Sequence, residues 1–381
     1  MFKNFFLSLI NLIKFINLDS KKKDFVFYTE SKFYRDYFID LILNLKKIDQ
    51  KNIIVVTSEK EDVVFFKDIA MCFYIKNYFF LSIFFKILNS RFLIMTLTDL
   101  GSHFQKSKLC KYYVYYFHAI ASTHRIYTNT AFKNYDLILS NGDYQTKELR
   151  LAEKQFNFPE KEIVNTGYFF LDNIKKKANL KLKEKQNILF APSWNYNKKN
   201  LFDDYGIEII SSLLSNNFII NFRPHPEHYK RSQHTINKII KSFSNNKNFF
   251  LDQSISNLKS LEKTEILITD CSSIVFEFMF VFKRPIIYLD YIEKIHNINL
   301  NKILIKTIEE EFKSIFGNVL SITNLKDLPD LCRKLINKNN ISNELINSFE
   351  KKYLSNVNTS ASFAAQYLTA KLSSIMTSHK T

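Results

Sequence analysis

Short apolar runs alternate with amphipathic stretches along most of the chain. Runs rich in β-branched and aromatic residues predict buried strands at 25–29, 53–57, 92–97, 112–117 and 137–140. Amphipathic stretches of helical length separate several of these runs, for example 32–46 and 144–156. Because strands that alternate with helices form parallel sheets covered on both faces, the pattern predicts an α/β fold.

The same alternation restarts in the second half. Further strands are predicted at 188–191, 218–222, 249–251, 266–269 and 286–289, with helices at 205–214 and 236–243. Between the halves, residues 175–186 carry six lysines and little apolar periodicity, as in a solvated linker, although a charged helix end is the alternative. We therefore expect two Rossmann-like domains that face a central cleft, 23–178 and 187–381, the second with a helical tail from residue 325.

Residues 1–22 form a separate, largely apolar segment that lysine and asparagine interrupt. A spanning helix needs about 20 mainly apolar residues, so this segment is too short and too polar to cross a membrane. Its apolar part ends at residue 18, and three lysines follow at 21–23. Two interpretations stay open: a helix that lies on an anionic membrane surface, or a first helix packed on its own domain.

The composition excludes several classes of enzyme and binding site. The chain has 381 residues with 54 Lys+Arg against 37 Asp+Glu, a net charge of +17. Its 5 glycines are too scattered for the glycine-rich loops of dinucleotide oxidoreductases and P-loop NTPases, so a bound phosphate must rely on a helix N-terminus or on cationic side chains. Its 4 cysteines are far apart, which argues against a zinc motif or a disulfide framework and favours a reducing, cytoplasmic setting.

Two polar clusters follow predicted strands, where open α/β sheets bind ligands. The first is Arg223-Pro224-His225-Pro226 after 218–222. Its prolines restrict the backbone of the histidine, and its arginine suits bidentate binding of a phosphate. The second is Asp270-Cys271-Ser272-Ser273 after 266–269. One of its serines is the expected N-cap of an apolar helix from Ile274, whose free N–H groups would bind an anion, and Glu277 on the first turn could accept from ribose or polyol hydroxyls.

Two further strand ends carry candidate residues. His118 follows 112–117 and is a candidate general base, whereas His124 could simply point into solvent. Ser193 and Trp194 follow 188–191. Two roles stay open for Trp194, which is the only tryptophan: stacking on a base, or filling the wall of the cleft.

Together these motifs resemble the CDP-glycerol glycerophosphotransferase family, which builds teichoic-acid-like polyol-phosphate chains. The resemblance covers about residues 110–290. Its nucleotide-binding half rests on Phe190-Ala191-Pro192-Ser193-Trp194, Arg223-Pro224-His225-Pro226 and Thr269-Asp270-Cys271-Ser272-Ser273 with Glu277 and Lys283-Arg284-Pro285. Ahead of these motifs, Phe117-His118, Ala131-Phe132-Lys133-Asn134-Tyr135-Asp136 and Gly167-Tyr168 are similar to the acceptor-side half. It implies a GT-B-type fold and transfer of glycerol phosphate from CDP-glycerol to a hydroxyl of a polyol-phosphate or glycan acceptor, with release of CMP.

The resemblance also implies residue roles. His118 and His225 would be the catalytic pair. The donor site would comprise Arg223, Asp270, Ser272, Ser273, Glu277, Ser193 and Trp194. No cofactor is required, although a divalent metal could assist the diphosphate. Many family members have Gly after the first His and a Lys soon afterwards; here Ala119 follows and the next cation is Arg125, which leaves the acceptor and the polyol open.

Three other functions remain as alternatives. A GT-B glycosyltransferase that uses a nucleotide sugar would keep the fold and change the bond made. A nucleic-acid-binding protein would explain the charge and the aromatic residues, but no RNA- or DNA-binding motif occurs. A non-catalytic membrane-bound scaffold is the third. The favoured interpretation is an EC 2.7.8 type phosphotransferase of teichoic-acid-like or capsule synthesis, without a nucleic-acid partner, in the cytoplasm or peripheral on the inner face of the membrane.

Overall fold

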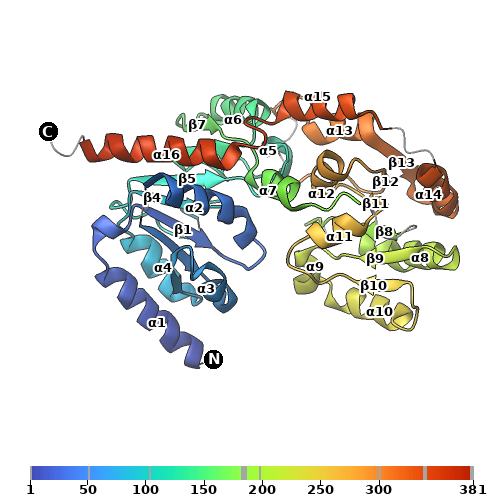
Figure 1. Cartoon of the computed structure of the whole chain (residues 1–381), viewed down its shortest axis with the longest axis horizontal. Helices are drawn as coiled ribbons and strands as arrows, with labels where there is room; N and C mark the ends of the chain where they lie inside the picture. Colours follow the sequence, from blue (N-terminus) through green and yellow to red (C-terminus); the bar gives the residue numbers. More distant parts are fainter. Residues whose placement is uncertain are drawn as a thin grey trace. The chain divides into compact units, whose positions relative to one another are not determined.

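The computed structural model describes residues 2–49, 52–102, 104–181, 187–196, 199–297, 299, 302–337 and 341–377 (Figure 1). The chain divides into two compact units, each built around a parallel sheet. The first unit comprises Met1–Ile120, Thr128–Asn173 and Tyr353–Thr381, and the second comprises Ala121–Tyr127 and Ile174–Lys352.

In the described part of the first unit, the strands form a sheet in the order β3-β2-β1-β4-β5-β6-β7. They are β1 (Phe25–Thr29), β2 (Ile53–Thr57), β3 (Met71–Tyr74), β4 (Phe92–Met95), β5 (Tyr112–Tyr116), β6 (Leu137–Ser140) and β7 (Glu162–Asn165). The inner strands β1, β2, β4 and β6 are buried along their whole length because helices cover both faces. The order reverses between β1 and β4, so the loops after these strands border the crevice where such sheets bind ligands.

The helices of the first unit are α1 (Phe2–Asn17), α2 (Arg35–Asp49), α3 (Lys60–Phe66), α4 (Tyr78–Ile87), α6 (Asp143–Phe156), the start of α7 (Phe169–Lys177) and α16 (Ser360–Thr377). Alternate residues of the inner strands share one core with α2 and α16. The buried positions of α16 recur at helical spacing and are Ala361, Ala364, Ala365, Leu368 and Leu372.

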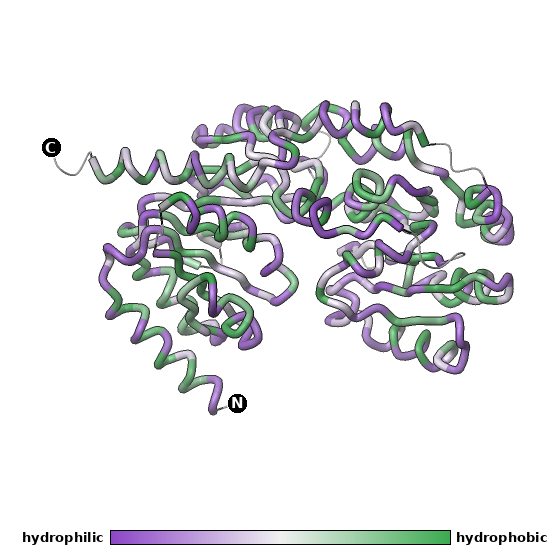
Figure 2. The backbone as a smooth tube through the Cα atoms, viewed as in Figure 1, coloured by the Kyte–Doolittle hydropathy of each residue, from purple (hydrophilic) through white to green (hydrophobic). Residues whose placement is uncertain are grey.

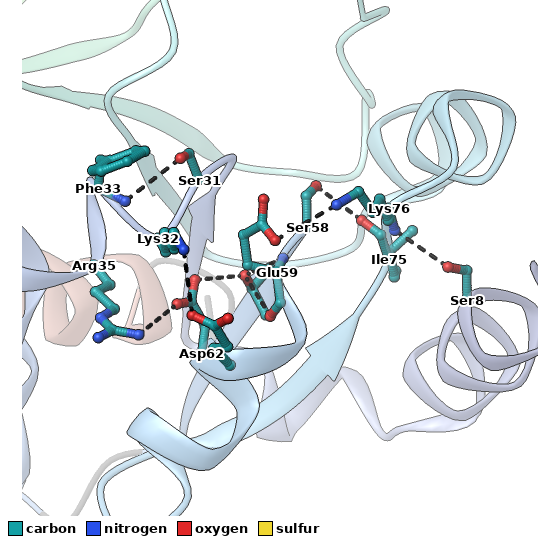
Figure 3. A network of polar contacts seen from close by, with 12 residues as sticks. Ser8, Ser31, Lys32, Phe33, Arg35, Ser58, Glu59, Asp62, Ile75 and Lys76 are labelled. Carbon is teal, nitrogen blue, oxygen red and sulfur yellow. Dashed lines mark hydrogen bonds and ion pairs between the residues drawn. The ribbon is translucent and has the colours of Figure 1, made fainter. Parts of the chain in front are cut away.

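The first helix packs on its own unit. It contacts β3 and α4, and Phe15 lies edge-on to Phe73 and Phe84 at 5.5 and 5.1 Å between ring centroids. The Lys76 N–H, just after β3, donates to Ser8 Oγ at 3.2 Å (Figure 3). Hydrophobic and hydrophilic positions alternate along α1 (Figure 2), and a second apolar face of the helix is exposed. Among the described residues, no helix is both long and apolar enough to cross a membrane.

The second unit repeats the strand order of the first. Its described strands form the sheet β10-β9-β8-β11-β12-β13. They are β8 (Asn187–Phe190), β9 (Ile219–Phe222), β10 (Phe249–Leu251), β11 (Ile266–Thr269), β12 (Ile286–Asp290) and β13 (Gly317–Ser321). The order reverses between β8 and β11, which is therefore the expected ligand crevice of this sheet.

The remaining helices belong mainly to the second unit. They are α5 (Thr123–Ile126), α8 (Leu201–Ser215), α9 (Pro226–Arg231), α10 (Gln233–Phe243), α11 (Leu258–Lys263), α12 (Ile274–Glu277), α13 (Ile308–Phe316), α14 (Leu328–Asn337) and α15 (Asn343–Tyr353). The core of this unit joins alternate residues of the inner strands to α8, α10 and α14.

The pattern of the sequence predicts all the inner strands, most of them to within one residue at each end, and misses three edge strands. The missed strands β3, β7 and β13 each lie at the end of a sheet. An edge strand is covered less than an inner one, and these three mix exposed or half-exposed positions with apolar ones, so they form no continuous apolar run.

The unit boundaries differ from the predicted domain boundaries. Residues 175–177 end helix α7 instead of starting a linker, and the boundary between the units falls inside that helix. Residues 182–186 of the predicted linker lie outside the described residues. The tail from 325 is helical as predicted, but its last helix, α16, packs in the first unit, where Asp172 accepts from the Asn358 and Ser360 N–H groups at 2.7 and 3.0 Å.

We expect Leu368→Ala to lower the free energy of unfolding by ~2–5 kcal/mol, because the side chain is fully buried in the core between α16 and α2. Met376→Ala, at the exposed end of the same helix, should change it by less than ~0.5 kcal/mol. Urea unfolding followed by circular dichroism measures both variants. Equal effects would contradict the packing of α16 in the first unit.

Candidate donor and catalytic site

A carboxylate joins the two loops at the point where the second sheet reverses its strand order. The Ser193 N–H donates to Asp270 Oδ1 and the Ser193 hydroxyl donates to Asp270 Oδ2, both at 2.8 Å, and both residues are buried. The Thr269 hydroxyl donates to the Ala191 carbonyl at 2.7 Å beside them. Two residues predicted at the donor site are therefore in direct contact, and the loops after β8 and β11 are held together.

The serine pair lies next along the chain. Ser273 is the N-cap of α12, as predicted, but its side chain makes no capping hydrogen bond. The α-helical segment has only 4 residues and continues as a π-helical turn, Phe278–Phe282, so the field of an aligned helix is weak here. The hydroxyls of Ser272 and Ser273 are consequently the stronger candidates for binding an anion. Glu277 is buried at the end of α12.

A cavity opens beside Asp270 and Ser272. Its enclosed volume is about 60 Å³. Among its lining residues are the Tyr288 and Tyr291 side chains, the carboxylates Asp270, Asp290, Glu293, Glu309 and Glu310, and the cations Arg125 and Lys313. Because the carboxylates outnumber the cations, the cavity favours neutral groups that donate hydrogen bonds over a diphosphate.

Arg125 reaches this cavity from a distant part of the sequence. Segment Ala121–Tyr127 belongs to the second unit: the Ser122 N–H donates to Glu309 Oε1 at 3.0 Å, and the Ile308 N–H donates to Ser122 Oγ at 2.9 Å. His124, which was expected to point into solvent, is instead buried, with Nε2 at 3.3 Å from the Ile305 carbonyl. No local signal in the sequence predicts contacts across so many residues.

Arg223 follows β9 as predicted, but its guanidinium already has partners. It donates to Asp252 Oδ2 at 2.5 Å, to Ser254 Oγ at 3.1 Å and to the Ile255 carbonyl at 3.4 Å. Burial pushes the pKa of Asp252 upward, but the charge of Arg223 and hydrogen bonds from Ser254 and Ser260 outweigh burial and hold that pKa below its usual value. Arg223 therefore holds the loop after β10 in addition to any contact with a phosphate.

His225 is the N-cap of α9, which follows directly after Arg223-Pro224. The Glu227 N–H donates to His225 Nδ1 at 3.2 Å, and the His225 N–H donates to Nδ1 of His228 at 3.0 Å. Because Nδ1 of His225 accepts a hydrogen bond from a backbone amide, the neutral ring carries its proton on Nε2. The histidine is thus held as an Nε2 hydrogen-bond donor.

Trp194 lies behind this helix. Its ring is 7% exposed and meets the rings of His228 and Tyr196 edge-on, at 5.1 and 6.3 Å between centroids. Of the two roles that the sequence left open, these contacts favour filling the wall. Cys271, between Asp270 and Ser272, is also no nucleophile, since burial and the nearby Asp270 raise its pKa to about 12.

His118 belongs to the first unit, two residues after β5. The Tyr34 and Tyr37 rings lie edge-on to its imidazole at centroid distances of 5.1 and 6.1 Å. The Tyr168 hydroxyl donates to its main-chain carbonyl at 3.0 Å. The tyrosines around the ring were not predicted, because Tyr34 lies just before α2, Tyr37 lies in α2 and Tyr168 lies in the loop after β7.

The sequence matches the family described as CDP-Glycerol:Poly(glycerophosphate) glycerophosphotransferase over residues 21–362. The chain belongs to this family. The family predicted from the motifs is therefore confirmed, and the match extends well beyond the motifs at both ends. No curated protein sequence matches the chain.

Several solved structures are similar in fold to this glycerophosphotransferase. The wall teichoic acid polymerase TagF shares 16% identity at a TM-score of 0.60, covering 98% of this chain and 99% of that one. A TagF variant soaked with CDPG shares 16% sequence identity at a TM-score of 0.60, covering 97% of this chain and 93% of that one. A UDP-GlcNAc 2-epimerase of Methanocaldococcus jannaschii shares 14% sequence identity at a TM-score of 0.60, covering 91% of this chain and 99% of that one. Such identities concern the fold alone, and the predicted GT-B-like fold is confirmed.

The sequence leaves open whether a divalent metal assists the diphosphate. In the parts of the chain that the structure describes, no group of three or more His, Cys, Asp and Glu side chains could hold a metal ion. The carboxylates around the cavity are mostly paired with main-chain groups or cations, as Glu309 is with Ser122 and Asp290 is with Lys313 at 3.1 Å.

We expect Asp252→Asn to lower the stability of the protein near neutral pH by ~1–3 kcal/mol, because Arg223 loses its charged partner. The stabilisation by the carboxylate is present above its unfolded-state pKa of about 4 and is lost as the pH falls through the lower folded-state pKa. The variant and the wild type should therefore converge in acid. Urea unfolding at neutral and acid pH tests this, with Asp330→Asn in an exposed pair as control. A difference that is independent of pH would refute the assignment.

Proposed function

We propose that this glycerophosphotransferase transfers glycerol phosphate from CDP-glycerol to a hydroxyl of a polyol-phosphate acceptor, as a phosphotransferase for substituted phosphate groups in teichoic-acid-like polymer synthesis. The observation that carries the proposal is the family match over residues 21–362, together with predicted donor residues that meet at the strand reversal of the second sheet. The second unit is the proposed donor-binding unit, and the first unit is the proposed acceptor unit.

The donor diphosphate binds at the loop after β11 in this proposal. The hydroxyls of Ser272 and Ser273 donate to its oxygens, since neither is used to cap α12. Arg223 supplies positive charge nearby while it stays paired with Asp252. Glu277 accepts from donor hydroxyls, and Asp270 acts through Ser193 by keeping the loops in place. The acidic cavity takes an uncharged, hydroxyl-bearing part of a substrate, because its carboxylates accept hydrogen bonds and repel phosphate.

The reaction needs one proton acceptor and stabilisation of the phosphate charge. The acceptor oxygen attacks the phosphorus that bears glycerol, a new phosphorus–oxygen bond forms, and the bond to the bridging oxygen breaks, whose electron pair leaves with CMP. His118 removes the proton of the acceptor hydroxyl. His225 donates from Nε2 to the diphosphate, for which its Nδ1 contact with the Glu227 N–H prepares it.

We also propose that α1 holds the enzyme on an anionic membrane surface, where a lipid-linked acceptor would be presented. The outward face of the helix carries Phe5, Phe6, Ile10, Ile13 and Ile16, all exposed. Lysines flank this face on the helix and follow it at 21 and 22, and α1 itself contains no acidic residue. A helix with one apolar face bordered by lysines binds in the interface of anionic bilayers, and the opposite face of α1 is anchored through Ser8.

His118→Ala and His225→Ala should each lower the rate of CMP release from CDP-glycerol by about 10²–10⁴-fold, because each removes a proton-transfer or charge-stabilising group. The assay measures CMP by chromatography in the presence of a glycerophosphate acceptor, and circular dichroism monitors folding. His234→Ala, on the exposed side of α10, is the matched control and should stay near the wild-type rate. Near-normal turnover in either site variant removes that histidine from the mechanism, and nucleotide release from sugar nucleotides alone would favour a glycosyltransferase.

The double variant Phe6→Glu with Ile13→Glu should weaken binding to anionic phosphatidylglycerol vesicles by at least about tenfold, because two apolar side chains no longer enter the interface and two negative charges are added. Co-sedimentation measures the bound fraction. Leu304→Glu changes an equally apolar, exposed residue of the second unit and should bind like wild type. Equal binding by both variants would rule out α1 as the anchor.

A further inference from the structure

A second histidine lies directly behind His225. His228 is in α9, its side chain is fully buried, and its ring packs on Phe202 and Trp194 at centroid distances of 4.4 and 5.1 Å. The motif that drew attention in the sequence ends at Pro226, so His228 had no assigned role. Its neighbours are aromatic rings on one side and the N-terminal turn of α9 on the other.

The polar contacts of His228 are directed at the backbone of His225. The His225 N–H donates to Nδ1 of His228 at 3.0 Å, and the His228 N–H donates to the His225 carbonyl at 2.8 Å. Together with the bond from the Glu227 N–H to His225 Nδ1, these contacts form a reciprocal capping box. The third helical position of such a box is usually Glu or Gln, whose side-chain oxygen accepts from the N-cap amide; here an imidazole nitrogen does the same.

The buried ring is neutral and accepts through Nδ1. Burial, helped by the charge of Lys294, lowers the pKa of His228 to about 3, although Glu227, on its own helix, acts in the opposite direction. A neutral ring that accepts at Nδ1 carries its proton on Nε2, which is buried and has no hydrogen-bond partner in the described structure. Burying such a donor is costly, which indicates that the Nδ1 contact is what retains a histidine here.

We propose that His228 is a positioning residue, which fixes the backbone of His225 and thereby aims the imidazole of His225 at the donor diphosphate. This inference rests on the proposed function. Pro224 and Pro226 restrict the chain on both sides, and the His225 N–H between them is satisfied by the His228 side chain. Trp194 and Phe202 hold the His228 ring, so in this proposal Trp194 acts on the donor site indirectly, through His228.

Two substitutions separate this role from simple packing. His228→Gln keeps a hydrogen-bond acceptor at the position where capping boxes use it, but loses the aromatic ring. His228→Phe keeps the ring and loses the acceptor. We expect His228→Gln to retain kcat for CMP release within about threefold of wild type, and His228→Phe to lower kcat by about 10- to 100-fold with little change in KM for CDP-glycerol, since small misplacements of a catalytic group cost that much.

The thermal midpoints should rank in the opposite order, with His228→Phe at or above His228→Gln, because the buried site is aromatic. His234→Gln, the same exchange at an exposed position, controls for the loss of a histidine. If the folded Phe variant is as active as the Gln variant, or more active, His228 only fills space and the inference is overturned. A wild-type protein that releases no CMP at all would instead overturn the proposed function.

One measurement on the wild type needs no variant to fold. Nitrogen-15 spectra of histidine-labelled protein should assign His228 to the Nε2–H tautomer and show no protonation between about pH 5 and 8. A His228 that titrates in this range, or that carries its proton on Nδ1, cannot accept from His225 and would overturn the inference independently of activity.

Discussion

The second unit, which is the proposed donor-binding unit, depends on one short polar contact: the carboxylate of Asp270 accepts from the main-chain N–H and from the hydroxyl of Ser193. Strand order reverses there, so the helices after β8 and β11 run to opposite faces of the sheet and their loops would otherwise separate. A buried carboxylate with two hydrogen bonds holds them at a fixed distance. That contact also positions Ser272 and Ser273, because they lie two and three residues after Asp270.

Around this point, the arginine and histidine motif is organised in the same manner. Arg223 binds the loop after β10 through Asp252, and His225 is held by the first turn of its own helix. The charged and polar side chains of this motif are therefore largely hydrogen-bonded to other groups of the protein. A site built in this way is ordered before a substrate arrives, so the side chains and loops of the protein lose less entropy when the donor binds.

The sequence predicts the inner strands, the strand-end motifs and the family, because buried strands are continuous apolar runs and parallel sheets bring their carboxyl ends to one edge. It does not reveal which groups satisfy Arg223, or that His228 faces His225, since both depend on how loops and rings meet in space. Three of the edge strands were missed for a related reason: β7 and β13, for example, are largely half-exposed, and their mixed polarity resembles that of a loop.

Segment Ala121–Tyr127 begins three residues after His118 and is part of the second unit, where the His296 and Asn297 N–H groups donate to the Arg125 carbonyl at 3.0 and 3.2 Å. The chain passes from one unit to the other after Ile120, Tyr127, Asn173 and Lys352. Dividing the chain at one position therefore cannot yield a fragment that contains one complete unit. A fragment that starts at Ile174 would leave main-chain donors unsatisfied and an apolar surface uncovered, so exchanging halves between relatives requires splicing a seven-residue insert together with the larger piece.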